Sequence, residues 1–182
     1  MNLALKLLNI YIPSSIRKSG LKQLFKATAE AFECAVPDIQ GLSANESLRQ
    51  YALFTRSQVE KLINSRNDLE AVKKRLYEKA FQLGESYRKK FRVRTLKDVM
   101  YTGHIIYRII GIEFQGDPNG EVIIRRCYFS NFYNDQVCQV MSAMDKGVLA
   151  GLANRGELIF SSRITENQSC CKANFVLSEK VK

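Results

Sequence analysis

Proline and glycine are scarce in this sequence of 182 residues, which contains three prolines and ten glycines. Charged residues make up 25% of the chain and hydrophobic residues 46%. This composition excludes collagen-like repeats, low-complexity architecture and extended disorder as the main design. The length is enough for one sizeable hydrophobic core and is close to the usual size of one domain. We therefore expect a single globular domain over residues 1–182.

Long apolar runs are also missing. A transmembrane helix needs about 18 or more mostly uncharged apolar residues, and the most apolar N-terminal stretch, Met1–Pro13, is interrupted by Lys6. No small-residue cleavage site follows this stretch, and Arg17 and Lys18 come after it, which is the wrong order for a secretory signal. We expect a protein without a transmembrane segment, located in the cytoplasm.

The cysteines do not form a disulfide pattern. Their number, five, is odd, they are unevenly spread, no C-x-x-C pair is present, and the chain has a single histidine, His104. This usage favours a reducing compartment in which the thiols bind metal, react or are simply buried. His104 lies in a predicted helix and is expected to be structural. The cysteines are Cys34, Cys127, Cys138, Cys170 and Cys171.

Apolar residues recur at helical spacing through most of the first 110 residues. The pattern predicts helices over about 15–34 and 44–64, a third from near Asp68 and a fourth from Thr95. Capping-box pairs mark two of the starts, because a hydroxyl and a carboxylate three residues apart can satisfy the first free amides of a helix. These pairs are Ser43 with Glu46 and Thr95 with Asp98.

The periodicity changes at Gly111, where two short runs flank a Gly-Asp-Pro-Asn-Gly turn and predict a β-hairpin. A helix is predicted over 135–152, and a second hairpin over 157–165 and 170–177. No flexible linker separates this β-β-α-β-β half, residues 111–182, from the helical part, residues 1–110. We therefore expect an α+β fold in which the N-terminal helices cover one face of a small antiparallel sheet.

The chain is basic, with a formal net charge of +10. Between Arg66 and Lys97, basic residues exceed acidic ones by seven, eleven against four. Such a patch could neutralise phosphates, but no nucleic-acid recognition motif accompanies it, and basic residues mixed with glutamates are typical of the solvated face of a long helix. We do not expect nucleic acid as a partner; an anionic membrane surface is a further alternative.

The helix between the hairpins carries Cys138 and Asp145, which lie seven residues apart and therefore on nearly the same side. A carboxylate on an apolar stripe needs a partner if it is buried, either a nearby arginine or a hydroxyl, and otherwise lies hydrated at the edge. The candidate partners are Arg163, Arg126 and Arg125. Gly147 and Gly151, four residues apart, suggest that this helix closely approaches the sheet or another helix.

Strand alternation places Cys171 on the packed face of the last strand and Cys170 on the polar face. It places Cys127 with Ile123, Arg125 and Phe129. Cys127, Cys138 and Cys171 lie in three successive elements that should touch. Three interpretations follow: zinc ligands, a nucleophile with neighbours, or inert core thiols.

The C-terminal third resembles the L-2-amino-thiazoline-4-carboxylic acid hydrolase family in the segments 126–133, 160–165 and 171–175, together with Cys138 and Asp145. This resemblance implies an enzyme that opens a cyclic thiazoline by adding water and gives N-carbamoyl-L-cysteine. The motif residues that correspond are Cys127, Cys138, Asp145, Arg163, Thr165 and Cys171.

The same region also looks like the small-ligand sensor domains of the four-vinyl-reductase type, in which a helix and two hairpins enclose an apolar cavity and cysteines near its rim bind zinc. Cys138 and Cys171 match two of those ligands in spacing, while Arg163 stands where another cysteine is expected. This resemblance implies a non-catalytic binding module. It also suggests a zinc alternative on Cys127, Cys138 and Cys171; otherwise we expect no cofactor.

Together these patterns predict a cavity between the 135–152 helix and the sheet, with a small molecule as partner; a homo-oligomer remains an option. In the hydrolase hypothesis, Asp145 activates water, Arg163 holds a substrate carboxylate, and Cys127 or Cys138 assists as nucleophile or acid. Strict alternation places Arg163 opposite Leu158, so it reaches the helix only if the helix covers that face or a bulge intervenes. Aromatic walls and substrate contacts are expected from Tyr128, Phe129, Phe160 and Thr165.

Overall fold

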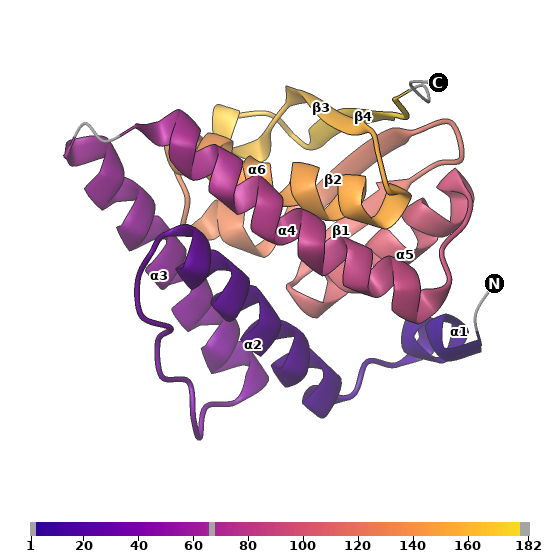
Figure 1. Ribbon diagram of the computed structural model, residues 1–182, viewed down its shortest axis with the longest axis horizontal. Helices are drawn as coiled ribbons and strands as arrows, with labels where there is room; N and C mark the ends of the chain where they lie inside the picture. The colour runs from indigo at the N-terminus through magenta and orange to yellow at the C-terminus, as the bar shows by residue number, and fades with distance from the viewer. Residues whose placement is uncertain (1–2, 66–67, 179–182) are drawn as a thin grey trace.

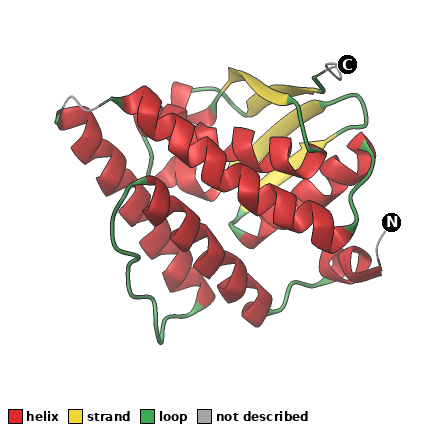
Figure 2. Ribbon diagram, viewed as in Figure 1, coloured by secondary structure: helices red, strands yellow, loops and turns green. Residues whose placement is uncertain are grey.

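A computed structural model describes residues 3–65 and 68–178 and shows an α+β protein in which the helices precede and then cover a four-stranded sheet (Figures 1 and 2). This confirms the predicted fold class. None of the helices within the described ranges is long and apolar enough to cross a membrane. The helices before the sheet are α1 (Leu3–Ile10), α2 (Ser14–Ala31), α3 (Ala44–Asn64), α4 (Leu69–Phe91) and α5 (Leu96–Ile109).

Both predicted capping boxes are present. The Ser43 hydroxyl accepts a hydrogen bond from the Glu46 amide at 3.2 Å, and the Glu46 carboxylate accepts one from the Ser43 amide at 2.8 Å. Thr95 and Asp98 form the same pair of bonds, each at 3.1 Å. Helix α1 was not predicted, because its eight residues are too few to show a clear period.

The sheet has the order β1-β2-β4-β3 and is antiparallel throughout. The two predicted hairpins therefore join through β2 and β4, with helix α6 between them in sequence. A short 3₁₀ turn follows β2 at residues 128–131, and another lies in the connection between β3 and β4 at residues 164–166. Residues 128–129 and 164–165, which were predicted as strand, belong to these turns. The remaining elements are β1 (Ile112–Gly116), β2 (Glu121–Cys127), α6 (Asp135–Ala153), β3 (Glu157–Ser162) and β4 (Cys171–Val176).

One face of the sheet packs against the helices. In β4, Cys171, Ala173 and Phe175 are buried and the residues between them are exposed, as alternation predicted. The buried apolar residues of the sheet and of helices α1 to α6 belong to one contiguous core.

Helices α4 and α6 approach each other so closely that only glycine fits at their contact. A Cβ atom on Gly147 would lie 2.3 Å from the Tyr77 carbonyl oxygen, and one on Gly151 would lie 2.2 Å from the Phe81 carbonyl oxygen. The predicted close approach is therefore confirmed, and its partner is α4. This contact fixes the rotation of α6, so that Cys138 and Asp145 face the interior of the protein.

Candidate functional site

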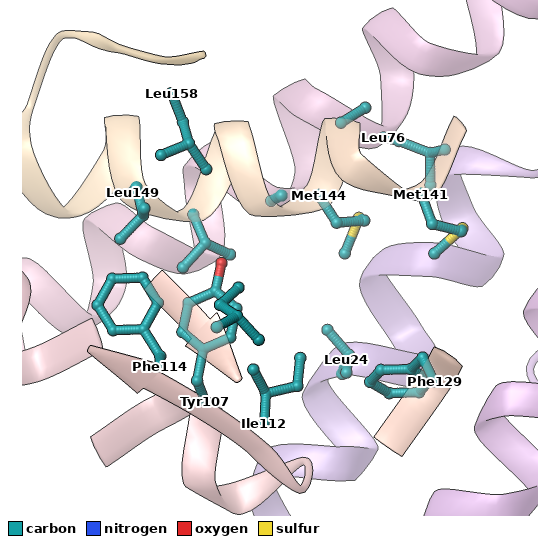
Figure 3. Close-up of a cluster of buried hydrophobic side chains, with 14 of the residues drawn as sticks. Leu24, Leu76, Tyr107, Ile112, Phe114, Phe129, Met141, Met144, Leu149 and Leu158 are labelled. Carbon is teal, nitrogen blue, oxygen red and sulfur yellow. The ribbon is translucent and has the colours of Figure 1, made fainter. Parts of the chain in front are cut away.

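A cavity of about 110 Å³ lies among helices α2 to α6 and the first hairpin. Figure 3 shows part of its wall, with the Tyr107 ring rising from α5 toward α6 and the side chains of Met141 and Met144 on α6. Most of the lining is apolar, which suits a small and largely apolar ligand. The lining residues are Gly20, Leu24, Tyr51, Leu83, Tyr87, Ile106, Tyr107, Ile109, Ile110, Ile112, Cys127, Phe129, Tyr133, Cys138, Met141, Ser142, Met144, Asp145 and Val148.

Asp145 is the one carboxyl group in this wall. Its Oδ1 accepts a hydrogen bond of 2.8 Å from the Tyr107 hydroxyl, and its Oδ2 has no hydrogen-bond partner within residues 3–65 and 68–178. Burial raises the pKa of Asp145 from its ordinary value of 3.8 to about 6, against the opposing effects of the Tyr107 hydrogen bond and the Arg163 charge. The side chain retains some accessible surface because it borders the cavity.

The partner of Asp145 is therefore a hydroxyl, one of the two kinds of partner that the sequence suggested, and not one of the three candidate arginines. Arg126 instead pairs with Glu113 at 2.7 Å, and Arg125 bonds to Gln115. Both arginines are exposed on β2. The sequence contains a signal that could have identified Tyr107 as a partner: it is a tyrosine within an apolar helical stripe, and a buried tyrosine hydroxyl normally requires a hydrogen-bond partner.

Cys127 lines the cavity because of a β-bulge. Ile112 pairs with Cys127 and Phe114 pairs with Ile124, so three steps along β2 oppose two steps along β1. The extra residue reverses the alternation. Cys127 was predicted to share a face with Ile123 and Arg125, and this prediction is wrong: the bulge turns Cys127 to the helix-covered side.

A second bulge redirects Arg163. Phe160 pairs with Ala173 and Ser162 pairs with Lys172, which leaves one extra residue in β3. Arg163 consequently turns toward α6, where its Nε donates to Ser142 Oγ at 3.4 Å. Its guanidinium also bonds to Glu166 at 3.1 Å and lies 4.7 Å from the centre of the Phe160 ring.

The predicted direct pair between Arg163 and Asp145 does not form among the described residues. Arg163 influences the pKa of Asp145 through its charge, but it is not part of the cavity lining. Its contacts join β3 to α6 and to the turn at 164–166. The structure therefore supports a positioning contact for Arg163 rather than a free guanidinium facing a ligand.

The thiols near the cavity are protonated at neutral pH. Burial raises the pKa of Cys127 to about 12 and that of Cys138 to about 11, and it also raises the pKa of Cys171. Cys171 lies outside the cavity lining, and its sulfur accepts a hydrogen bond from the Ile164 amide at 3.4 Å. Thiols in this state are poor nucleophiles.

The zinc alternative on Cys127, Cys138 and Cys171 does not fit the geometry. Within the parts of the chain that the structure describes, no three Cys, His, Asp or Glu side chains are arranged to hold a metal ion. The lone histidine, His104, forms a 2.8 Å hydrogen bond between its Nδ1 and the Phe114 carbonyl, a structural contact between α5 and β1.

Three predicted wall residues lie outside the cavity lining: Tyr128, Phe160 and Thr165. The Thr165 hydroxyl lies beside the Cys138 thiol, whose pKa it lowers, yet its Oγ1 is buried without a hydrogen bond of normal geometry. Phe129 does line the cavity, as predicted. The other aromatic walls come from Tyr51, Tyr87, Tyr107 and Tyr133.

The hydroxyls of these four tyrosines are all engaged by protein groups. Tyr51 bonds to Thr28 at 2.8 Å, Tyr133 bonds to Thr55, and Tyr87 donates to Gln23 at 3.3 Å. Tyr107 donates to Asp145. The aromatic walls therefore present mainly their ring surfaces to the cavity, and Asp145 Oδ2 remains as its strongest free acceptor.

Neither a scan against protein-family models nor a search of the curated proteins found a match to this chain. Function is therefore inferred from the site.

Proposed function

We propose that this protein binds a small, mainly apolar molecule that carries a hydrogen-bond donor or a cationic nitrogen. The observation that carries this proposal is the Asp145 carboxyl group in an otherwise apolar cavity, with Oδ2 unpartnered among the described residues. Asp145 keeps accessible surface toward the cavity. A ligand that donates to Oδ2 forms a charge-assisted hydrogen bond in largely apolar surroundings, so Asp145 contributes both affinity and selectivity.

The charge of the site favours neutral or cationic ligands over anionic ones. A ligand carboxylate would lie near the Asp145 carboxylate, and Arg163, which was expected to hold it, is engaged with Glu166 and Ser142. Like charges in a buried site repel strongly. A cyclic amidine or amine without a carboxylate group therefore fits the cavity best.

Two matched probes test this proposal: 2-amino-2-thiazoline, which presents N–H donors, and 2-methyl-2-thiazoline, which has a similar shape without them. Hydrogen bonds to a charged group contribute roughly 1.5 to 3 kcal/mol, so calorimetric titration at pH 7 should show about 10- to 100-fold tighter binding of the amino compound. The Asp145→Asn variant should lose most of this preference.

Asp135→Asn is the matched control, because Asp135 lies on the same helix and is exposed. It should leave the preference for the amino probe unchanged. Equal affinity for the two probes, or no binding of the amino probe, would contradict the proposed ligand class. An unchanged preference in Asp145→Asn would remove Asp145 as the anchor.

The second candidate is a hydrolase that opens a cyclic amidine or thiazoline by adding water. It is favoured by the pKa of Asp145, which at about 6 lets the carboxyl group exchange a proton near neutral pH. Asp145 would act as general base toward water, since Cys127 and Cys138 are protonated thiols. Incubation with 2-amino-thiazoline-4-carboxylate, followed by mass spectrometry for the product containing one more water, separates turnover from simple binding.

We propose the cytoplasm as the compartment. All five cysteines are free thiols in the structure, and a reducing environment preserves such thiols. Fractionation of cells that produce the tagged protein would test this placement.

A further inference from the structure

Exposed apolar side chains concentrate on α1 and at the start of α2. Leu7 is 60% exposed, Ile10 81%, Tyr11 69% and Ile16 38%. All four line one surface hollow of about 590 Å³ beside α5 and the end of α4. They therefore form a continuous patch, here called the N-terminal apolar face, rather than scattered surface residues. A patch of this kind usually marks an interaction site.

Helix α1 is apolar on both of its sides. Leu5 is buried and Leu8 packs against the core, while Leu7 and Ile10 point outward. A surface helix of a globular protein normally turns polar residues toward water. The outward side of α1 has the character of a helix that lies in the interface of a membrane, with apolar residues below the headgroups.

Charged residues are few on this face, and those on α1 and in the wall of the hollow, Lys6 and Lys90, are basic. Residues 1–29 contain five lysines and arginines and no aspartate or glutamate, and the first acidic residue is Glu30 at the far end of α2. Lys90 of α4 lines the same hollow. A surface that is both apolar and negatively charged complements this face. The five basic residues are Lys6, Arg17, Lys18, Lys22 and Lys26.

We propose that the N-terminal apolar face docks on an anionic membrane surface, with Leu7, Ile10 and Tyr11 entering the interface and Lys6 and Lys90 contacting the headgroups. Apolar insertion and basic attraction together give stable peripheral binding, whereas either alone is weak. A second copy of the chain fits less well, because a symmetric contact would bring identical basic surfaces together.

The hollow lies next to the inner cavity. Gly20, Tyr87, Ile106 and Ile109 line both of them, so these side chains form a shared wall. Docking would then place the ligand cavity close to the bilayer, which is a source of apolar molecules. This connection rests on the proposed function; the docking itself does not.

Vesicle co-sedimentation tests the docking directly. The full chain should bind phosphatidylcholine vesicles that contain about 30% phosphatidylserine, should bind much less to pure phosphatidylcholine, and should dissociate as salt is raised. Ile10→Asp should reduce binding at least about 10-fold. The double variant Lys6→Gln/Lys90→Gln, which changes the exposed lysine of α1 and the lysine that lines the hollow, should reduce it about 25-fold, from about five-fold for each lysine.

Matched controls come from the exposed face of the sheet. Ile159→Asp changes an isoleucine that is 50% exposed on β3, and Lys172→Gln changes an exposed lysine on β4. Both should bind vesicles like the wild type. Melting curves verify folding, and if Ile10→Asp lowers the melting temperature, the lysine variant decides the test.

Three results would overturn the proposal. The first is equal binding to neutral and anionic vesicles, or binding to neither. The second is equal vesicle binding by Ile10→Asp and Ile159→Asp, or equal vesicle binding by the double lysine variant and Lys172→Gln. The third is a concentration-dependent dimer that Ile10→Asp abolishes, which would assign the face to self-association. Failure of the thiazoline probes to bind would leave the docking intact, because the vesicle assay requires no ligand in the cavity.

Discussion

Replacing Asp145 with asparagine should stabilise the protein at neutral pH. The Asp145 carboxylate lies largely inside the protein, its one hydrogen bond comes from Tyr107, and it makes no direct ion pair among the described residues. Burial therefore costs more than these interactions return, which is why its pKa lies above the ordinary value. Asparagine has nearly the same shape, and its carbonyl can still accept the hydrogen bond from Tyr107.

The magnitude follows from the pKa of Asp145. Between its ordinary value of 3.8 and about 6 in the folded protein, the folded state binds more protons than the unfolded state, so stability falls as pH rises through this window. At about 1.4 kcal/mol for each pH unit, the full cost above pH 6 is about 3 kcal/mol. The unpartnered amide of asparagine subtracts about 1 kcal/mol, which leaves an expected gain of about 2 kcal/mol at pH 7.

Urea unfolding of wild type, Asp145→Asn and the exposed control Asp135→Asn at a series of pH values measures this effect. The advantage of Asp145→Asn should be full above pH 6 and should disappear toward pH 4, while Asp135→Asn should lose up to about 1 kcal/mol, because it removes a carboxylate from the first turn of α6. A variant less stable than the wild type at pH 7, by the several kcal/mol expected when a buried ion pair is broken, would refute the reasoning. That result would show that Asp145 and Arg163 pair directly.

Three further outcomes are expected. Gly147→Ala should lower the free energy of unfolding by about 3 kcal/mol, measured by urea titration, because its Cβ would overlap the α4 backbone. Lys146→Ala on the same helix should have little effect. Cys127 and Cys138, whose pKa values are raised to about 12 and about 11, should react with iodoacetamide at pH 8 far more slowly in the folded than in the urea-unfolded protein, as peptide mass spectrometry would show. Limited proteolysis should release no stable folded fragment 1–110, because the helices and the sheet share one core.

Local sequence signals were sufficient for the elements themselves. The capping residues Ser43 and Thr95 marked helix starts within one residue, since capping depends on contacts three residues apart. The change from helical to strand periodicity at Gly111 gave the architecture, and Cys138 and Asp145 were correctly placed on one inward side of α6.

The errors have a common cause in non-local structure. Strict alternation placed Cys127 on the wrong side, because a bulge depends on how two strands pair and leaves no clear mark in either one alone. The aromatic walls from α3, α4 and α5 were missed for a related reason. Helix crossing angles and contacts across the fold decide which tyrosines reach the cavity, and periodicity gives only the inward stripe of each helix.

The two bulges and the glycine contact act together on α6. Gly147 and Gly151 hold α6 against α4, so its opposite side cannot rotate away from the first hairpin. The bulge in β2 then brings Cys127 to the cavity, and the bulge in β3 lets Arg163 bond to Ser142 on α6. Asp145 is thereby held in place by the fixed helix that carries it and by its hydrogen bond from Tyr107. A selective anchor for a small ligand requires this kind of preorganisation.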